Sequence, residues 1–222
     1  MSSSCPECVY HNVDQNTDAW QALRLGRVTA SSFVKWLTQK LRLSDSQTAE
    51  SYMLDVVGEI ISGRNVEIPT TQAMQWGHDT EPIAREVYEH ITGHDVADGG
   101  FVSYGERFGC SPDGLISDDG GLEIKCPFTI REHLRVVLER KLPPAHRLQV
   151  LSSLWMTGRE WWDYCSYHPA VPNVNAAMFV TRVQMSDSER SAMRQAAESF
   201  AARIDRTLQR LEVASGYSDR TK

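Results

Sequence analysis

The sequence predicts an α/β fold in which helices flank a small central mixed sheet. Residues 18–91 have apolar side chains at helical spacing, which indicates that the chain begins with helices. Residues 99–126 and 160–183 contain short apolar runs separated by turn residues, which is typical of strands. Residues 129–157 and 186–213 return to helical spacing. Helices therefore precede, interrupt and follow the strands.

The helices of the first half have recognisable starts and stops. Asp18 is expected to cap a short helix that carries Trp20, Leu23 and Leu25. Thr29 and Ser31 precede the apolar set of a second helix, over 33–37. Longer helices are predicted over 44–61, before Gly63, and over 70–91, before Gly93, where Gly77 and Pro82 interrupt the pattern.

The second half alternates strands with helices. Asp118-Asp119-Gly120-Gly121 is a strong hairpin signal, so the strands on either side of it should pair. Pro143-Pro144 opens a helix that runs to Thr157, and Ser186-Asp-Ser-Glu189 is a capping box that starts a final helix reaching about Val213. A further helix is expected over 129–138, and strands over 99–103, 115–117, 122–126, 160–167 and 176–183.

The 222 residues suffice for one domain with a sizeable core. We expect a flexible lead-in over 1–15, a single domain over 16–214 and a tail over 215–222. No apolar run approaches the roughly 20 residues that span a bilayer, and the first residues do not resemble a signal peptide, so a cytoplasmic protein is expected. Five scattered cysteines fit a reducing compartment. The net charge of −6 argues against a surface coated in basic patches for open DNA binding.

Two short motifs carry the chemistry. They are Ser111-Pro-Asp113-Gly-Leu and Gly121-Leu-Glu123-Ile-Lys125. The hairpin should bring Asp113 and Glu123 together, and Glu123 and Lys125, two apart on one strand, should share a face. Two carboxylates suit Mg²⁺, and a second ion about 3.5–4 Å away would stabilise a leaving oxygen. The lysine can orient or help deprotonate a water, or stabilise charge on phosphorus oxygens.

Each motif alone also has an ordinary explanation. A Pro-Asp-Gly triplet is usually a turn, and Glu-x-Lys on a strand is usually a solvated face. Here Glu123 and Lys125 alternate with Leu122 and Ile124, so their face must be a cleft or solvent if the other face is core. The combination therefore favours a metal-dependent nuclease.

Longer strings resemble a known family. Asp113 followed by Glu123-Ile-Lys125 resembles the PD-(D/E)xK nuclease signature. The phage lambda-type recombination exonucleases, the YqaJ-like family, have strings similar in order and spacing to Trp20-Gln-Ala-Leu-Arg24-Leu-Gly-Arg-Val-Thr-Ala-Ser31, Trp76-Gly77-His-Asp-Thr-Glu81, Cys110-Ser-Pro-Asp-Gly-Leu and Leu122-Glu-Ile-Lys-Cys-Pro-Phe. The resemblance extends from about Trp20 to the last helix.

The resemblance implies a restriction-endonuclease-like core and a processive 5′→3′ exonuclease on double-stranded DNA. Such enzymes digest one strand, leave a 3′ overhang for phage homologous recombination and pass it to a single-strand annealing protein. They form a ring-shaped homotrimer around the DNA, and only the channel of such a ring needs to be basic. The resemblance implies two Mg²⁺ ions as cofactor, for which Mn²⁺ can substitute. It also implies a protein that is encoded by a phage or prophage and acts in the bacterial host cell.

The resemblance also implies further site residues. Glu81 is expected as an additional acid near the metal, beside Asp113, Glu123 and the backbone carbonyl of Ile124. Four residues match positions at which members of the family contact the substrate or its 5′ phosphate: Arg24, Ser31, Ser111 and Gln149. Arg is suited to bidentate phosphate contacts, and Ser31 would stand at a helix N-terminus. A second glutamine expected after Gln149 is replaced by Leu151.

Other functions remain open at this level. The same core could belong to a structure- or sequence-directed endonuclease, or to a non-catalytic DNA-binding protein. Cys5 and Cys8, with His11 nearby, hint at zinc, but no fourth ligand is evident. The histidines, among them His78, His133 and His146, are expected to be structural or exposed.

Overall fold

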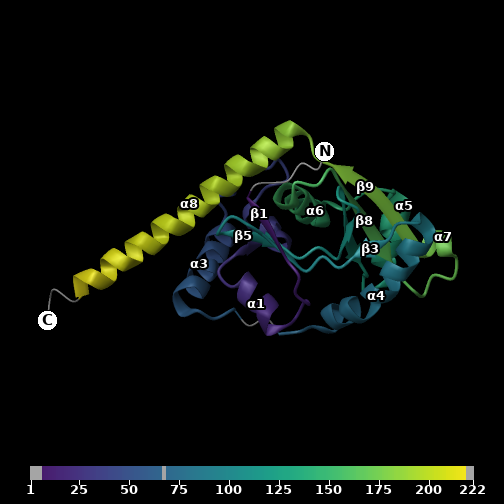
Figure 1. Cartoon of the computed structure of the whole chain (residues 1–222), viewed down its shortest axis with the longest axis horizontal. Helices are drawn as coiled ribbons and strands as arrows, with labels where there is room; N and C mark the ends of the chain where they lie inside the picture. The colour runs from purple at the N-terminus through teal and green to yellow at the C-terminus, as the bar shows by residue number, and fades with distance from the viewer. Residues whose placement is uncertain (1–6, 67–68, 219–222) are drawn as a thin grey trace.

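The computed structural model describes residues 7–66 and 69–218, and it has a mixed α/β architecture of two mixed sheets flanked by helices (Figure 1). The helical elements are α1 (Asp18–Arg24), the 3₁₀ turn η1 (Ala30–Ser32), α2 (Phe33–Trp36), α3 (Gln47–Ser62), α4 (Gln72–Thr92), α5 (Ile130–Glu139), α6 (Pro144–Thr157), α7 (Val174–Ala177) and α8 (Asp187–Ser218). The strands are β1 (Cys8–His11), β2 (Val28–Thr29), β3 (Val96–Ala97), β4 (Phe101–Tyr104), β5 (Phe108–Cys110), β6 (Gly114–Ile116), β7 (Gly120–Lys125), β8 (Trp161–Tyr167) and β9 (Met178–Gln184).

The two sheets differ from the single sheet expected from the sequence. The described strands form a four-stranded sheet in the order β1-β4-β5-β2 and a five-stranded sheet in the order β3-β6-β7-β8-β9. In the larger sheet β6 and β7 pair antiparallel, β7 and β8 pair parallel, and β8 and β9 pair antiparallel. The parallel pair is possible because α5 and α6 provide the crossover between β7 and β8.

Most of the expected elements are confirmed within a few residues. The predicted helices over 44–61, 70–91, 129–138 and from Pro143-Pro144 to Thr157 correspond to α3, α4, α5 and α6. The turn between β6 and β7 lies where the Asp-Asp-Gly-Gly signal placed it. The capping box is also confirmed, since Ser186 Oγ accepts from the Glu189 N–H at 3.2 Å and Glu189 Oε2 accepts from the Ser186 N–H at 3.0 Å.

Several local expectations were wrong. Thr17, not Asp18, caps α1, because the Thr17 hydroxyl accepts the Trp20 N–H at 3.3 Å. Strand β1 (Cys8–His11), which the sequence did not predict, lies within the expected lead-in over 1–15 and pairs with β4, and residues 1–6, including Cys5, lie outside the described residues. The last helix continues past Val213 into the expected tail, as far as Ser218, and residues 219–222 are outside the described part.

Helix α6 is the centre of the main core. Leu148, Leu151 and Leu154 on this helix are each at most 1% exposed. Phe33 and Trp36 of α2 pack on the same core, and Trp36 stacks on Phe200 of α8 with ring centroids 4.5 Å apart. Full burial of one such large apolar side chain stabilises the folded protein by roughly 1.5–3 kcal/mol. Helix α6 is thereby packed against β8, which neighbours β7.

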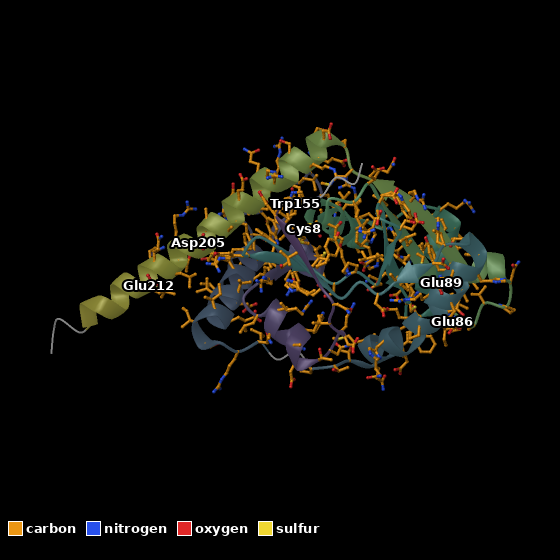
Figure 2. The ribbon with its side chains drawn as sticks, viewed as in Figure 1. Cys8, Glu86, Glu89, Trp155, Asp205 and Glu212 are labelled. Carbon is orange, nitrogen blue, oxygen red and sulfur yellow. The ribbon has the colours of Figure 1, made fainter. Side chains whose placement is uncertain are left out.

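Helix α8 packs along the core with its first half and extends away from the body with its second half (Figure 1). Figure 2 shows Trp155 within the crowded interior, whereas Glu212 stands on the extending part of α8. None of the helices in the described ranges has the combination of length and apolar character that crossing a membrane requires.

Candidate active site

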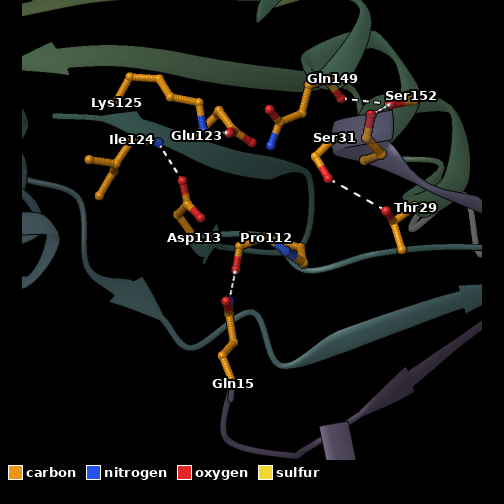
Figure 3. Close-up of polar contacts among 11 residues, drawn as sticks. Gln15, Thr29, Ser31, Pro112, Asp113, Glu123, Ile124, Lys125, Gln149 and Ser152 are labelled. Carbon is orange, nitrogen blue, oxygen red and sulfur yellow. Dashed lines mark hydrogen bonds and ion pairs between the residues drawn. The ribbon is translucent and has the colours of Figure 1, made fainter. Parts of the chain in front are cut away.

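Asp113 and Glu123 face each other across the β6–β7 hairpin. Asp113 directly precedes β6, and the register pairs Gly114 with Leu122, so the next residues outward, Asp113 and Glu123, are also opposite. Asp113 Oδ2 accepts a 2.6 Å hydrogen bond from the backbone N–H of Ile124. This hydrogen bond joins the start of β6 to Ile124 of β7, the residue between Glu123 and Lys125 (Figure 3).

Lys125 lies on the same strand face as Glu123, as its spacing predicted. Its ammonium donates a short hydrogen bond to Glu123 Oε1. The Glu123 side chain is 1% exposed, whereas that of Lys125 is 28% exposed. The lysine therefore reaches from the buried acid toward the opening of the site.

The hairpin sits against β8 through a close glycine contact. A Cβ at Gly121 would lie 2.3 Å from the Trp162 ring, and Trp162 is fully buried. Only glycine allows the tryptophan to cover this part of β7. Trp162 thus holds the strand that carries Glu123 and Lys125.

Helix α4 brings a third acid and an arginine to the site. Glu81 and Arg85 are four residues apart and lie on the same helix face. The Arg85 guanidinium donates a short hydrogen bond to the backbone carbonyl of Asp113, and its other nitrogen donates to Asp98 Oδ1 at 2.6 Å. Glu81 is close enough to Asp113 and Glu123 for their charges to raise its pKa.

The carboxyls of this cluster are difficult to ionise together. Burial, followed by the charge of Asp113, raises the pKa of Glu81 to about 8. Burial raises the pKa of Glu123 to about 7 despite the neighbouring Lys125, and burial also raises the pKa of Asp113. Burial alone would lower the pKa of Lys125, but the charges of Glu123 and Asp113 outweigh it and raise that pKa. A cation placed among these carboxyls would stabilise their charged forms.

The donor set fits a hard divalent cation bound in an open site. Mg²⁺ takes oxygen ligands and keeps several waters, so two carboxylates, a backbone carbonyl and a substrate phosphate suffice. Asp113 and Glu123 offer the carboxylate oxygens at facing positions. No three His, Cys, Asp or Glu side chains in the described ranges are grouped closely enough to form a closed metal cage. An ion here would therefore depend on Asp113, Glu123 and non-carboxylate oxygens rather than on an all-protein shell.

Arg24 lines a separate cavity of about 360 Å³ between α1 and α3. Its guanidinium lies 4.2 Å over the centre of the Trp20 ring, and burial lowers the pKa of Arg24. Arg27, Lys35, Thr29, Ser32, Asp55 and Glu59 also line this cavity. It thus combines several cationic and hydroxyl groups with two acids.

Trp20 connects that cavity to the hairpin. The indole N–H of Trp20 donates to Ser111 Oγ at 2.9 Å, and Ser111 is two residues before Asp113. Ser111 therefore lies between the Arg24 cavity and the carboxylates, although its hydroxyl is already a hydrogen-bond acceptor.

Ser31 and Gln149 also stand near Glu123 (Figure 3). Ser31 lies within η1, where its hydroxyl is 3.5 Å from that of Thr29. Gln149 is on α6, its backbone carbonyl accepts from Ser152 Oγ at 2.8 Å, and Figure 3 shows its side chain directed toward Glu123. The structure therefore gathers Asp113, Glu123, Lys125, Glu81, Ser111, Ser31 and Gln149 around one region, with Arg24 in an adjoining cavity.

Sequence reasoning did not single out Arg85 or Tyr164. Arg85 could have been found from its position one helical turn after Glu81, which places both on the same face. Tyr164 pairs with Glu123 across β7 and β8, is 1% exposed and stacks on His146. Strand register across a long crossover is not visible in a single sequence.

Known proteins resemble this chain in both sequence and structure. The family described as the YqaJ-like viral recombinase domain matches residues 19–160. An alkaline exonuclease from Laribacter hongkongensis, LHK-Exo, is 30% identical, with a TM-score of 0.80 over 90% of this chain and 99% of that one. The structure of LHK-Exo in complex with dAMP gives a TM-score of 0.81 at the same identity and coverage.

A more distant structure has the same fold. A phage-related exonuclease from Haemophilus somnus 129PT is 13% identical, with a TM-score of 0.68 over 83% of this chain and 96% of that one. No curated protein sequence matches this chain.

Proposed function

The chain belongs to the YqaJ-like viral recombinase domain family, and we propose that it is a metal-dependent exonuclease that digests double-stranded DNA. The observation that carries the proposal is the convergence of Asp113, Glu123 and Lys125 at one end of the β6–β7 hairpin. We further propose that the five-stranded sheet is a PD-(D/E)xK core, within a single nuclease domain that extends from β1 into α8. The acid that precedes β6 and the Glu-x-Lys face of β7 support this assignment.

Each residue has a role that its environment supports. Asp113, Glu123 and the Ile124 carbonyl would hold Mg²⁺, with Glu81 nearby and Mn²⁺ as a substitute for either of two ions. Bound there, Mg²⁺ would polarise the scissile phosphate and lower the pKa of an attacking water. Lys125 is kept positively charged by Glu123 and Asp113, so it would stabilise the negative charge that develops on the phosphorus oxygens.

The proposed polarity is 5′→3′, and the Arg24 cavity supports it. A terminal 5′ phosphate would enter this cavity, where Arg24 is fixed on Trp20 and hydroxyls of the η1 region are close. Arginine binds phosphate through paired N–H groups, which also fixes its orientation. Ser111, Ser31 and Gln149 would contact the strand between this phosphate and the carboxylates. Cleavage beside a bound 5′ end leaves a 3′ overhang.

The assembly proposal rests on the family alone. We propose a ring-shaped homotrimer that encloses the DNA and passes the 3′ overhang to a phage single-strand annealing protein in the host cytoplasm. Such a ring is compatible with the net charge of −6, because only the channel needs to be basic. Light scattering at micromolar concentration should give three times the chain mass, and a monomer would contradict the assembly.

Digestion of labelled DNA tests the proposed activity. A linear duplex with a 5′ phosphate, labelled at either end, should lose nucleotides from the 5′ end when Mg²⁺ is present. A covalently closed circular duplex should remain intact. Cutting of the circle would indicate an endonuclease on the same core, and release from the 3′ end would reverse the polarity.

A further inference from the structure

A second cavity borders the candidate active site beside Lys125. Its volume is about 600 Å³, within the roughly 300–1,000 Å³ typical of small-molecule sites. It opens between the end of β7, α5 and the start of α6. Lys125, Tyr164, His146, Arg135 and Glu132 are among the side chains that line it.

This cavity and the Arg24 cavity have no lining residue in common. Thr29 lines the Arg24 cavity and Lys125 lines this one. In the view of Figure 3, Glu123 lies between Lys125 and the side of the site where Thr29 stands. A strand whose 5′ phosphate is held at Arg24, with its first linkage at Glu123, would therefore continue past Lys125.

One wall of the cavity is an aromatic pair. His146, in the first turn of α6, stacks on Tyr164 with ring centroids 5.6 Å apart and an interplanar angle of 20°. Tyr164 is anchored in β8 opposite Glu123 and is almost fully buried, while His146 is half-buried. Burial, followed by the charge of Lys125, lowers the pKa of His146 to about 4. At neutral pH the imidazole is uncharged and presents a flat surface suited to stacking.

The charges of the cavity suit one phosphodiester group. Lys141 Nζ is 3.3 Å from Glu139 Oε2, so these two charges largely cancel. Lys125, Arg135 and Glu132 are the other charged groups of the lining. Lys125 is paired with Glu123, so Arg135, beside Glu132, is the cation of the lining that remains to bind a phosphodiester.

We propose that this cavity receives the second nucleotide of the 5′-ended strand, with its base stacked on His146 and its 3′ phosphodiester beside Arg135. The inference rests on the proposed function, because it needs the first linkage to lie at Asp113 and Glu123. His146 is then a substrate-binding residue, whereas the sequence predicted a structural or exposed histidine. Stacking is tolerant of sequence, so any of the four bases would be accepted.

The test measures the fluorescence of a base analogue that is placed in the DNA at one position at a time. A 5′-phosphorylated duplex carries 2-aminopurine as the first or the second base, and the protein carries Asp113→Asn so that it binds without cutting. Emission from the second base should be quenched on binding. His146→Ala in this background should restore the emission and weaken binding about tenfold, whereas His146→Phe should preserve both. Emission from the first base should not respond to either substitution.

The control is His90→Ala, which removes an exposed histidine of α4. It should leave the quenching and the affinity unchanged. If the DNA binds but His146→Ala does not alter the second-base signal, the inference is overturned while the proposed function stands. If the duplex end does not bind and the unsubstituted protein does not cut, the proposed function fails and the inference fails with it.

Discussion

Asp113 and Ile124 are joined by a 2.6 Å hydrogen bond from the Ile124 backbone N–H to the Asp113 carboxylate. Ile124 lies between Glu123 and Lys125, so this bond sets the position of the Asp113 carboxylate relative to the side chains of both residues. The bond also uses only one of the two carboxylate oxygens of Asp113. The geometry of the site therefore depends on a hydrogen-bond acceptor at position 113. The negative charge of the site depends on that acceptor being a carboxylate.

Mg²⁺ is expected to stabilise the folded protein through this carboxylate. At ten times its dissociation constant, an ion that binds only the folded state adds about 1.4 kcal/mol. Calorimetry or thermal unfolding should show a rise in Tm with Mg²⁺ for the unsubstituted protein. Asp113→Asn keeps an acceptor for the Ile124 N–H but removes the charge, so its Tm should not respond to Mg²⁺. An equal response in this variant would exclude Asp113 as a ligand.

Glu81→Gln should stabilise the protein in a pH-dependent way. Folding raises the pKa of Glu81 from 4.5 to about 8, so the folded state holds a proton that the unfolded state loses between these values. The stability contributed by this group is complete below pH 4.5 and is lost as the pH rises through 8. Without metal, the Tm of Glu81→Gln should equal that of the unsubstituted protein near pH 4.5 and exceed it by a few degrees at pH 8.

The control for this measurement is Glu86→Gln, an exposed position of the same helix. It should show no such divergence with pH. The measured quantity is the Tm of Glu81→Gln minus that of the unsubstituted protein. A smaller difference at pH 8 than at pH 4.5 would contradict the burial of Glu81 among other acids.

Arg24→Gln should abolish the preference for a 5′ phosphate. A charged contact to phosphate is worth about 1.5–3 kcal/mol, which corresponds to roughly 10- to 150-fold. Initial rates on duplexes with a 5′ phosphate should fall by about this factor, while rates on 5′-hydroxyl duplexes should change little. Arg206→Gln, on α8, serves as the control. Equal losses on both substrates would mean that Arg24 has a general structural role.

Gly121→Ala should destabilise the fold, because its Cβ would lie 2.3 Å from the fixed ring of Trp162. Overpacking of this kind costs about 1–3 kcal/mol. In Gly58→Ala, in α3, the added carbon meets no atom within 4 Å apart from its chain neighbours and the backbone of its own helix, and the protein should gain about 0.5–1 kcal/mol of stability. Denaturant unfolding of the two variants should thus move the midpoint in opposite directions, and a neutral Gly121→Ala would show that the strand is not packed as described.

The helices and the central hairpin could be predicted because their signals are local. Helical spacing, Gly63 and Gly93 at the helix ends, and the Asp-Asp-Gly-Gly turn all depend on neighbours in sequence. The facing positions of Asp113 and Glu123 followed from that turn. The local patterns therefore sufficed to place the acids and the lysine.

The remaining features depend on contacts between distant segments. Strands β2, β3 and β5 have only two or three residues each, too few for a period to be visible. The division into two sheets and the pairing of Tyr164 with Glu123 depend on how helices cross between strands. The Trp20–Ser111 bond links positions 91 residues apart and has no local signal.

We propose that Lys125, beside Glu123 and Asp113, takes part in DNA cleavage. Lys125→Ala should be measured for cleavage of a 5′-phosphorylated linear duplex with Mg²⁺ and, separately, for binding of the same duplex. We expect the rate of cleavage to fall by at least about 100-fold, because removal of one group that stabilises charge in the transition state typically has an effect of this size, and we expect DNA binding to be largely retained. Undiminished cleavage by the Lys125→Ala protein would contradict this proposal.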